Sequence, residues 1–189
     1  QQEIRESRLD ITQKIVEKII KSENPPKLFI SGSAIGFYGE RGAQVVDESC
    51  LPGKEFVSDL AQQWEASCND IESENTRLVK IRTGIVLTKK GGALAKMLPV
   101  FKMGMGGRVG SGDQYMSWID INDFCKAILF IIEQHQLSGP INLVSPNPVS
   151  NKIFSKALSE QIARPCLLPL PAFMVKAMFG EMGQQLLLA

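Results

Sequence analysis

Two hydrophobic patterns alternate along the chain. Short runs of consecutive apolar residues favour strands that are buried on both faces, as in a parallel sheet covered by helices. Such runs predict strands at 28–31, 78–81, 85–87, 115–119 and 141–144. Between these runs, apolar residues recur every three or four positions and predict helices that end near 22, cover 55–72, begin at 91, begin at 120 and cover 150–163. Pro171 and Gly180 predict the start and the end of one more helix. This alternation of helix and strand predicts an α/β protein with a parallel sheet.

Each predicted helix should bury the apolar stripe that defines it. In the first helix the stripe consists of Ile4, Ile11, Ile15 and Ile19. In the helix that begins at 120 it consists of Ile121, Phe124, Cys125, Ile128, Leu129 and Ile132. We expect these side chains to lie in the core.

The order of the first elements predicts an incomplete sheet. A helix followed by a strand is half of a βαβ unit, which requires an earlier strand that these residues do not contain. The chain also begins without Met, within the first helical stripe, and ends on an apolar tail. We therefore expect a fragment that holds the second half of a doubly wound sheet.

The composition is that of one ordinary globular domain. The 189 residues are 44% hydrophobic and 22% charged, with a formal net charge of +1, a balance that favours neither nucleic acid nor an acidic membrane as partner. No apolar run approaches the roughly 20 residues that span a bilayer. The four cysteines form no Cys-x-x-Cys pair and have no His near them, which favours reduced thiols over disulfides or a metal site. We expect a cytoplasmic protein without metal.

Small and hydroxylated residues follow the strand at 28–31. Ser31 and Ser33 stand where this strand ends, and in open α/β sheets ligands bind outside the carboxyl ends of strands. Gly32, Gly36 and Gly39 allow a tight backbone and the close approach of a ligand. Ser31 and Ser33 are therefore the first candidates for a site.

Arg82 directly follows the strand at 78–81. An arginine in this place is either a surface charge or an anion ligand, and the spacing alone does not decide between them. Its planar fork suits phosphate or carboxylate better than a lysine would.

Three other features have plainer explanations. The glycine-rich stretch 104–112 matches neither Gly-x-Gly-x-x-Gly nor a P-loop, so a mobile connector is favoured over a phosphate cradle. Asp120 and Asp123 suit the first turn of a helix and favour capping over catalysis. His135 follows a predicted helix and is expected to be solvated.

The segment that reads Ser-Gly-Ser-Ala-x-Gly-x-Tyr-Gly, at 31–39, resembles the strand-end serine motif of the extended short-chain dehydrogenase/reductase families, the sugar-nucleotide epimerases and dehydratases. With the later segments, the chain is most similar to the atypical epimerase-family branch that has a small C-terminal helical domain. The resemblance implies a Rossmann-like doubly wound parallel sheet, present here as its second half, and a small mixed α/β substrate lobe. It assigns 1–145 to the NAD(P)-binding domain, with a substrate-side insertion at about 90–115, and 146–189 to the start of the lobe.

The resemblance also implies roles for individual residues. Ser33 and Tyr38 are the implied catalytic groups, because Ser33 would hydrogen-bond the reacting oxygen and Tyr38 is the nearest phenol to it. The implied cofactor-binding residues are Ser31, Gly32, Arg82, Thr83 and Gly84. The implied substrate-binding residues are Arg108 and Gln114. We expect the Ser33 hydroxyl to project from the sheet edge into a crevice, with Arg82 beside it.

One departure from the family pattern bears on mechanism. The family's Tyr-x-x-x-Lys, in which Tyr exchanges a proton and Lys lowers its pKa, has Phe56 and Leu60 as its nearest match here. Neither side chain can move a proton. A second departure is Asp120, which stands where His is common in the family.

Two functions follow from the resemblance. The first is an NAD(P)-dependent epimerase or oxidoreductase that acts on a carbonyl or sugar-nucleotide-like small molecule, with homodimers allowed. The second is a dinucleotide-binding sensor or interaction protein that has lost turnover. The choice between NAD and NADP is normally set after the second strand of the fold, which the resemblance places outside these residues together with the glycine-rich phosphate-binding turn.

Overall fold

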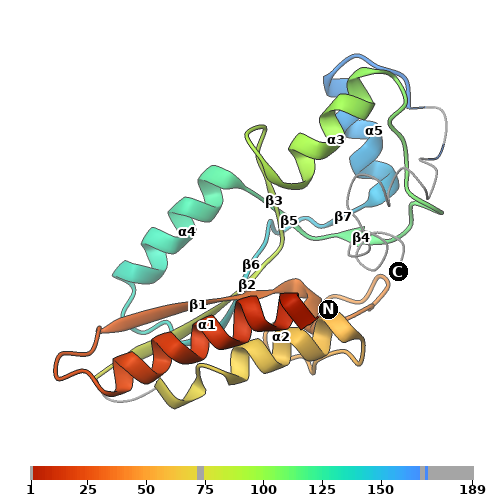
Figure 1. Cartoon of the computed structure of the whole chain (residues 1–189). Helices are drawn as coiled ribbons and strands as arrows, with labels where there is room; N and C mark the ends of the chain where they lie inside the picture. The colour runs from red at the N-terminus through yellow and green to blue at the C-terminus, as the bar shows by residue number, and fades with distance from the viewer. Residues whose placement is uncertain (1, 72–74, 167–168, 170–189) are drawn as a thin grey trace. The chain divides into compact units, whose positions relative to one another are not determined.

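A computed structural model of the chain describes residues 2–71, 75–166 and 169. The elements run in the order α1 (Gln2–Ile20), β1 (Leu28–Ala34), η1 (Ile35–Tyr38), α2 (Phe56–Ala66), η2 (Asn69–Ile71), β2 (Arg77–Thr83), β3 (Ile85–Leu87), α3 (Gly92–Lys102), β4 (Tyr115–Met116), β5 (Trp118–Asp120), α4 (Ile121–Glu133), β6 (Gly139–Leu143), β7 (Val149–Ser150) and α5 (Asn151–Gln161) (Figure 1). All five predicted strands and the five helices predicted up to residue 163 are present within a few residues of their expected positions. The helix predicted at 171–180 lies outside the described residues. The predicted α/β class is confirmed.

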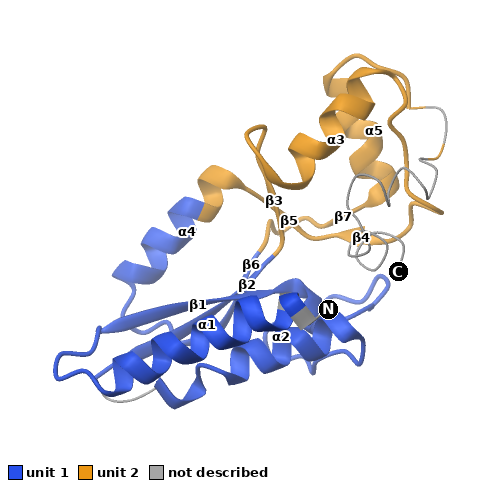
Figure 2. Ribbon diagram, viewed as in Figure 1, with its two compact units in different colours: residues 1–83, 125–143 blue, residues 84–124, 144–189 orange. Residues whose placement is uncertain are grey.

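The chain folds as two compact units (Figure 2). The first unit contains 1–83 and 125–143, and the second contains 84–124 and 144–189. The predicted insertion at 90–115 therefore falls in the second unit, as does the predicted lobe from 146 onward, of which 167, 168 and 170–189 lie outside the described residues. The assignment of either segment to a substrate lobe stays a prediction.

A three-stranded parallel sheet in the order β1-β2-β6 forms the centre of the first unit. Helices α1 and α2 lie side by side along β1 (Figure 1). Leu78 of β2 packs with Val16 of α1 and with Cys68 and Ile71, which follow α2. This cluster joins α1 and the segment after α2 to the sheet.

The buried face of α1 differs from the predicted stripe. Ile11 and Ile15 are exposed, whereas Thr12 and Val16 are buried. The Thr12 hydroxyl accepts a hydrogen bond of 3.0 Å from the indole nitrogen of Trp64 on α2. The buried positions 12 and 16 thus lie one residue beyond Ile11 and Ile15, whereas Ile19 of the predicted stripe packs, partly buried, against the cluster around Val16.

The predicted burial of the stripe on α4 is also wrong for part of that helix. Cys125, Leu129 and Ile132 are exposed, and Ile131 is the buried residue of the helix. The link between α4 and the sheet runs through its C-terminal end, where Arg77 of β2 donates hydrogen bonds to the carbonyl oxygens of Ile131, at 3.0 Å, and of Leu137. A guanidinium in this place satisfies carbonyls that the end of a helix leaves without helical partners.

At the other end of α4, the capping role predicted for Asp120 is confirmed. Its carboxylate accepts a hydrogen bond of 2.8 Å from the backbone nitrogen of Asn122, in the first turn of the helix.

The second unit is made of two small sheets with helices. β3 and β5 pair in parallel, and β4 and β7 pair antiparallel. The strand predicted at 115–119 is split at Ser117, whose carbonyl oxygen accepts a hydrogen bond of 2.8 Å from the nitrogen of Ile85. At the start of α5, the predicted cap Ser150 accepts a hydrogen bond from the nitrogen of Ile153. Within the described ranges, no helix combines the length and the apolar character that crossing a membrane would require.

Candidate functional site

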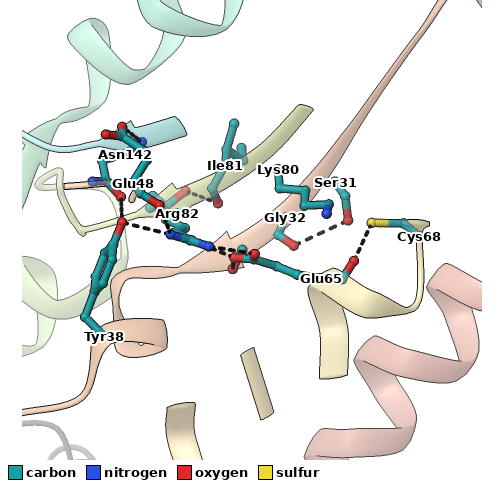
Figure 3. Close-up of polar contacts among 12 residues, drawn as sticks. Ser31, Gly32, Tyr38, Glu48, Glu65, Cys68, Lys80, Ile81, Arg82 and Asn142 are labelled. Atoms are coloured by element: carbon teal, nitrogen blue, oxygen red, sulfur yellow. Dashed lines mark hydrogen bonds and ion pairs between the residues drawn. The ribbon is translucent and has the colours of Figure 1, made fainter. Parts of the chain in front are cut away.

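The three parallel strands of the first unit carry a row of polar side chains near their carboxyl ends. Ser33 of β1 is the register partner of Arg82 of β2, and Arg82 is the partner of Asn142 of β6. Each of the three is the last residue but one of its strand. Register partners on parallel strands project from the same face of a sheet, and on this face Glu65 of α2 and Tyr38 of η1 join the row. Figure 3 shows Tyr38, Glu65 and Asn142 gathered around the Arg82 guanidinium.

Arg82 is the centre of this group. Its Nε and Nη2 donate to Glu65 Oε1 and Oε2 at 2.8 and 2.9 Å, a two-pronged ion pair. Its Nη1 donates to the Tyr38 hydroxyl at 3.0 Å, and its guanidinium carbon lies 3.5 Å from the centre of the Phe37 ring. Burial by itself would lower the pKa of Arg82, but the hydrogen bonds to Glu65 and Tyr38 raise it above the ordinary value. The guanidinium therefore stays charged in a buried place.

Ser33 shares a partner with Arg82. Its hydroxyl donates to Glu65 Oε1 at 2.6 Å, the same oxygen that accepts from Arg82 Nε. The structure thus places Ser33 and Arg82 side by side, as expected. It also buries both, with 6% and 3% of their surface exposed, so neither faces an open crevice in the described chain.

Tyr38 is held between Arg82 and β6. Its hydroxyl accepts from Arg82 and donates to Asn142 Oδ1 at 2.7 Å. Burial raises the pKa of the Tyr38 phenol above its ordinary value, and the hydrogen bonds to Arg82 and Asn142 oppose that rise. Glu48 closes the group, because its Oε1 accepts from the Asn142 backbone nitrogen at 2.7 Å.

Ser31 and Gly32, the remaining residues predicted at the end of β1, have packing contacts within the unit, and their contact with a cofactor stays a prediction. Ser31 is buried and donates weakly, at 3.4 Å, to the carbonyl oxygen of Gly32. A Cβ at Gly32 would lie 2.9 Å from the Trp64 ring, so the lack of a side chain there lets Trp64 approach the strand. Figure 3 shows Ser31 near Cys68, on the side of Glu65 away from Tyr38.

Thr83 and Gly84 lie where the first unit ends and the second begins. The Thr83 hydroxyl reaches only the carbonyl oxygen of Ile81, at 3.5 Å. A Cβ at Gly84 would lie 2.7 Å from the carbonyl oxygen of Ser117, so glycine is needed for the chain to pass Ser117. Their proposed contact with a cofactor stays a prediction.

Arg108 and Gln114 belong to the second unit. Arg108 is exposed and donates to the carbonyl oxygen of Ser111 at 2.7 Å, and Gln114 donates to that of Val109 at 3.0 Å. Helix α5 holds the same loop, since the Asn151 side chain accepts from the Val109 nitrogen at 2.7 Å. The glycine-rich stretch is thus tied to α5 by hydrogen bonds, unlike the mobile connector that the sequence favours.

Sequence reasoning missed Glu65, Asn142 and Glu48. For Glu65 a signal exists, because Ser58, Ala61 and Glu65 are spaced by three and four residues and all are buried on α2. That spacing marks a second stripe beside the apolar one, with a carboxylate at its end. Nothing comparable marks Asn142 or Glu48, which join the group through contacts remote in sequence.

The structure also bears on the proton shuttle and on metal binding. At the register nearest Tyr-x-x-x-Lys, Phe56 lies 5.2 Å below the Arg5 guanidinium carbon and Leu60 is buried. In the described part of the chain, no three His, Cys, Asp or Glu side chains come together in a way that could hold a metal ion.

Two known proteins that are similar to the chain are epimerase family proteins. No family model matches it. An epimerase family protein of Mycobacterium leprae is 41% identical over 187 residues, which are 99% of this chain and 60% of that protein. The human epimerase family protein SDR39U1 is 34% identical over 189 residues, which are 100% of this chain and 64% of that protein. The chain therefore spans about three fifths of the length of these curated relatives.

Solved structures agree with the relatives. The crystal structure of human epimerase family protein SDR39U1 (isoform 2) with NADPH has a TM-score of 0.89 and 32% identity, and the match covers 97% of this chain and 62% of that one. The crystal structure of the nucleoside-diphosphate sugar epimerase from Corynebacterium glutamicum has a TM-score of 0.74 and 34% identity, and the match covers 97% of this chain and 41% of that one. These matches confirm the Rossmann-like class and the resemblance to the epimerase-family branch.

Proposed function

We propose that the protein is an NAD(P)-dependent epimerase or oxidoreductase. The chain is homologous to the epimerase family proteins over nearly its whole length. The substrate class is a carbonyl compound or a sugar nucleotide, in keeping with the sugar-nucleotide epimerase among the solved structures. NADPH is the cofactor named with the human relative. In such an enzyme the nicotinamide carries the hydride and the protein positions it against the substrate.

The observation that carries this proposal is the row at the strand ends. Ser33, Arg82 and Asn142 meet at the carboxyl ends of three parallel strands, where open α/β sheets bind their ligands. Two hydroxyl groups, those of Ser33 and Tyr38, lie in one hydrogen-bonded group there. A reaction at a carbon that bears an oxygen needs such groups to bind the oxygen and to exchange its proton.

The groups present fit one end of the cofactor better than the other. Arg82 is the cation of the row, and its fork is occupied by the Glu65 carboxylate and the Tyr38 hydroxyl. Hydroxyl and amide groups suit the neutral nicotinamide amide and the substrate oxygen, whereas a pyrophosphate needs donors that are not already paired with a carboxylate. We assign Ser31, Gly32, Thr83 and Gly84 to the surroundings of the nicotinamide end, and Arg82 to the support of Tyr38.

A second function is favoured by a specific observation. The protons of Ser33 and Tyr38 are both directed to partners within the chain, and Phe56 and Leu60 stand at the register nearest Tyr-x-x-x-Lys. A dinucleotide-binding sensor without turnover would need no free proton donor. The two functions differ in whether hydride leaves the cofactor.

The test uses the protein as its gene encodes it. The protein is incubated with NADPH deuterated at the transferable position and a panel of carbonyl compounds, and separately with NADP⁺ and a panel of sugar nucleotides. Deuterium transfer to the carbonyl compounds is followed by mass spectrometry, and epimerisation of the sugar nucleotides is followed by chromatography. We expect turnover of at least one class, and a loss of kcat of about a hundredfold or more in Ser33→Ala and in Tyr38→Phe. Tyr115→Phe, at an exposed tyrosine of the second unit, is the matched control and should keep full activity.

Two outcomes would count against the enzyme. Binding of NADPH or NADP⁺ without turnover of any compound favours the sensor. Turnover that Ser33→Ala and Tyr38→Phe leave unchanged removes both residues from the proposed catalytic roles.

A further inference from the structure

One charged group of the row has no role in the function proposed above. Glu65 lies on α2 with 9% of its side chain exposed, and its carboxylate accepts hydrogen bonds from Ser33 and Arg82 of the row. A buried carboxylate is costly unless it is paired and hydrogen-bonded. Here it has both kinds of partner, and each of them is a residue proposed to act in the reaction or to support it.

The first contact fixes the direction of a proton. A serine hydroxyl has one hydrogen to donate and two lone pairs that accept. Because Ser33 donates its hydrogen to Glu65 Oε1 at 2.6 Å, the Ser33 oxygen offers only lone pairs to any other group. With Glu65 in place, Ser33 can receive a hydrogen bond from a hydroxyl or an amide but cannot donate one.

The second contact fixes the place of a charge. The two oxygens of Glu65 take Nε and Nη2 of Arg82, which leaves Nη1 directed at the Tyr38 hydroxyl at 3.0 Å. A positive charge at this distance favours the phenolate, and a negative charge behind it has the opposite effect. The negative charge of Glu65 therefore opposes the effect of the Arg82 charge on the ionisation of the Tyr38 phenol.

We propose that Glu65 is a positioning residue of this site, which holds the Arg82 guanidinium against the Tyr38 hydroxyl and directs the Ser33 proton away from a ligand. The proposal rests on the proposed function for its meaning in a reaction. Its physical content, the control of Tyr38 and Ser33 by Glu65, can be measured without any substrate.

Other charges near Tyr38 come from the segment around it. Glu48 raises the pKa of the phenol by its negative charge, whereas Arg82 lowers it. Arg41 donates to the Tyr38 carbonyl oxygen at 2.9 Å, and the Glu55 carboxylate lies against Gly39. The charges of Glu48, Arg41 and Glu55 are the same in a variant at 65, so the comparison isolates the Glu65 carboxylate and its hold on Arg82.

The experiment follows the two tyrosines of the 189-residue chain, Tyr38 and Tyr115. Tyrosine labelled with carbon-13 at the ring carbon that bears the hydroxyl gives one NMR signal for each residue, and Tyr38→Phe assigns them. Each signal is titrated with pH in the unchanged chain, in Glu65→Gln and in Arg82→Gln. Tyr115 is exposed and serves as the internal control in every titration.

Glutamine at 65 keeps the shape and an accepting oxygen but removes the negative charge. We expect the titration midpoint of Tyr38 to fall by about one pH unit in Glu65→Gln and to rise in Arg82→Gln, while Tyr115 does not move. A Tyr38 midpoint that stays or rises in Glu65→Gln would overturn the proposal.

If Glu65→Gln does not fold, the same titration is carried out on Arg82→Lys. A lysine keeps the positive charge but cannot span both oxygens of Glu65 and the phenol at once. The Tyr38 midpoint should then rise, and an unchanged midpoint would equally overturn the proposal. A midpoint that shifts as expected, in a protein that transfers no hydride, would leave the role of Glu65 standing and count only against the proposed function.

Discussion

At the scale of single residues, the first unit depends on a buried ion pair. Arg82 and Glu65 have 4% and 9% of their side chains exposed, and two charges taken out of water repay their desolvation only with close geometry and further hydrogen bonds. The hydroxyl groups of Ser33 and Tyr38 provide those bonds. The pair is therefore a means of fixing these hydroxyls in place more than a source of stability.

This balance predicts a large cost for breaking the pair and a small one for removing it. Glu65→Ala leaves Arg82 charged and buried, and should destabilise the first unit by about 3–5 kcal/mol. The double variant Glu65→Leu with Arg82→Met removes both charges and should recover at least about half of that loss. Urea unfolding followed by the fluorescence of Trp64, in a Trp118→Phe background, measures both. Equal losses in the single and the double variant would contradict this account of the pair.

At the scale of elements, the contact between α2 and β1 depends on one position without a side chain. Trp64 lies against the backbone of Gly32, and its indole nitrogen donates to Thr12 of α1. One aromatic ring thus joins the strand to both helices. The same contact carries Glu65, the next residue of α2, to its place beside Ser33.

A methyl group at 32 should therefore disturb both packing and the site. In Gly32→Ala the new Cβ would lie 2.9 Å from the Trp64 ring, and we expect a loss of about 1–3 kcal/mol from overpacking. Gly91→Ala is the matched control, because a Cβ there meets nothing within 4 Å and its φ of −178° is extended backbone. It should cost no more than about 1 kcal/mol as a change at a helix N-cap. Urea unfolding measures both variants. Equal losses of unfolding free energy in Gly32→Ala and Gly91→Ala would show that the Trp64 ring does not need the space at Gly32.

At the scale of the whole molecule, the described chain combines closed clusters with open apolar helix faces. Leu78, Val79 and Cys68 are almost fully buried in the first unit, whereas Leu129 and Phe130 of α4 are more than half exposed. Local opening is least frequent where buried contacts are dense. Chemical access should therefore differ sharply between the two regions.

The cysteines provide a test of that difference. Cys68 is fully buried, and burial raises the pKa of its thiol, so its reactive thiolate is rare. Cys125 is exposed on α4. With iodoacetamide at neutral pH, we expect Cys125 to be alkylated at least about a hundredfold faster than Cys68, as measured by peptide mass spectrometry over time. Comparable rates in the folded chain would show that the cluster around Cys68 opens readily, and urea should abolish the difference.

The success of the sequence analysis varied with the range of the interactions involved. The strand ends at Ser33 and Arg82 could be located because unbroken apolar runs stop there, and Asp120 could be identified as a cap because a cap bonds within its own turn. The faces of α1 and α4 could not be oriented with the same success. Ile11 and Ile15 continue a helical stripe, but a bond between Thr12 and Trp64 decides which side of α1 meets its neighbours.

The sequence by itself determined the α/β class, the order of helices and strands and the place of the serines at a strand end, because each follows from the polarity of residues close together in the chain. Only the tertiary structure decided that Glu65 binds Ser33 and Arg82, and that Tyr38 lies between Arg82 and Asn142. Those contacts join residues 17 to 104 positions apart. The energy of pairing a buried charge depends on which partners the fold brings to it, and no local pattern records that choice.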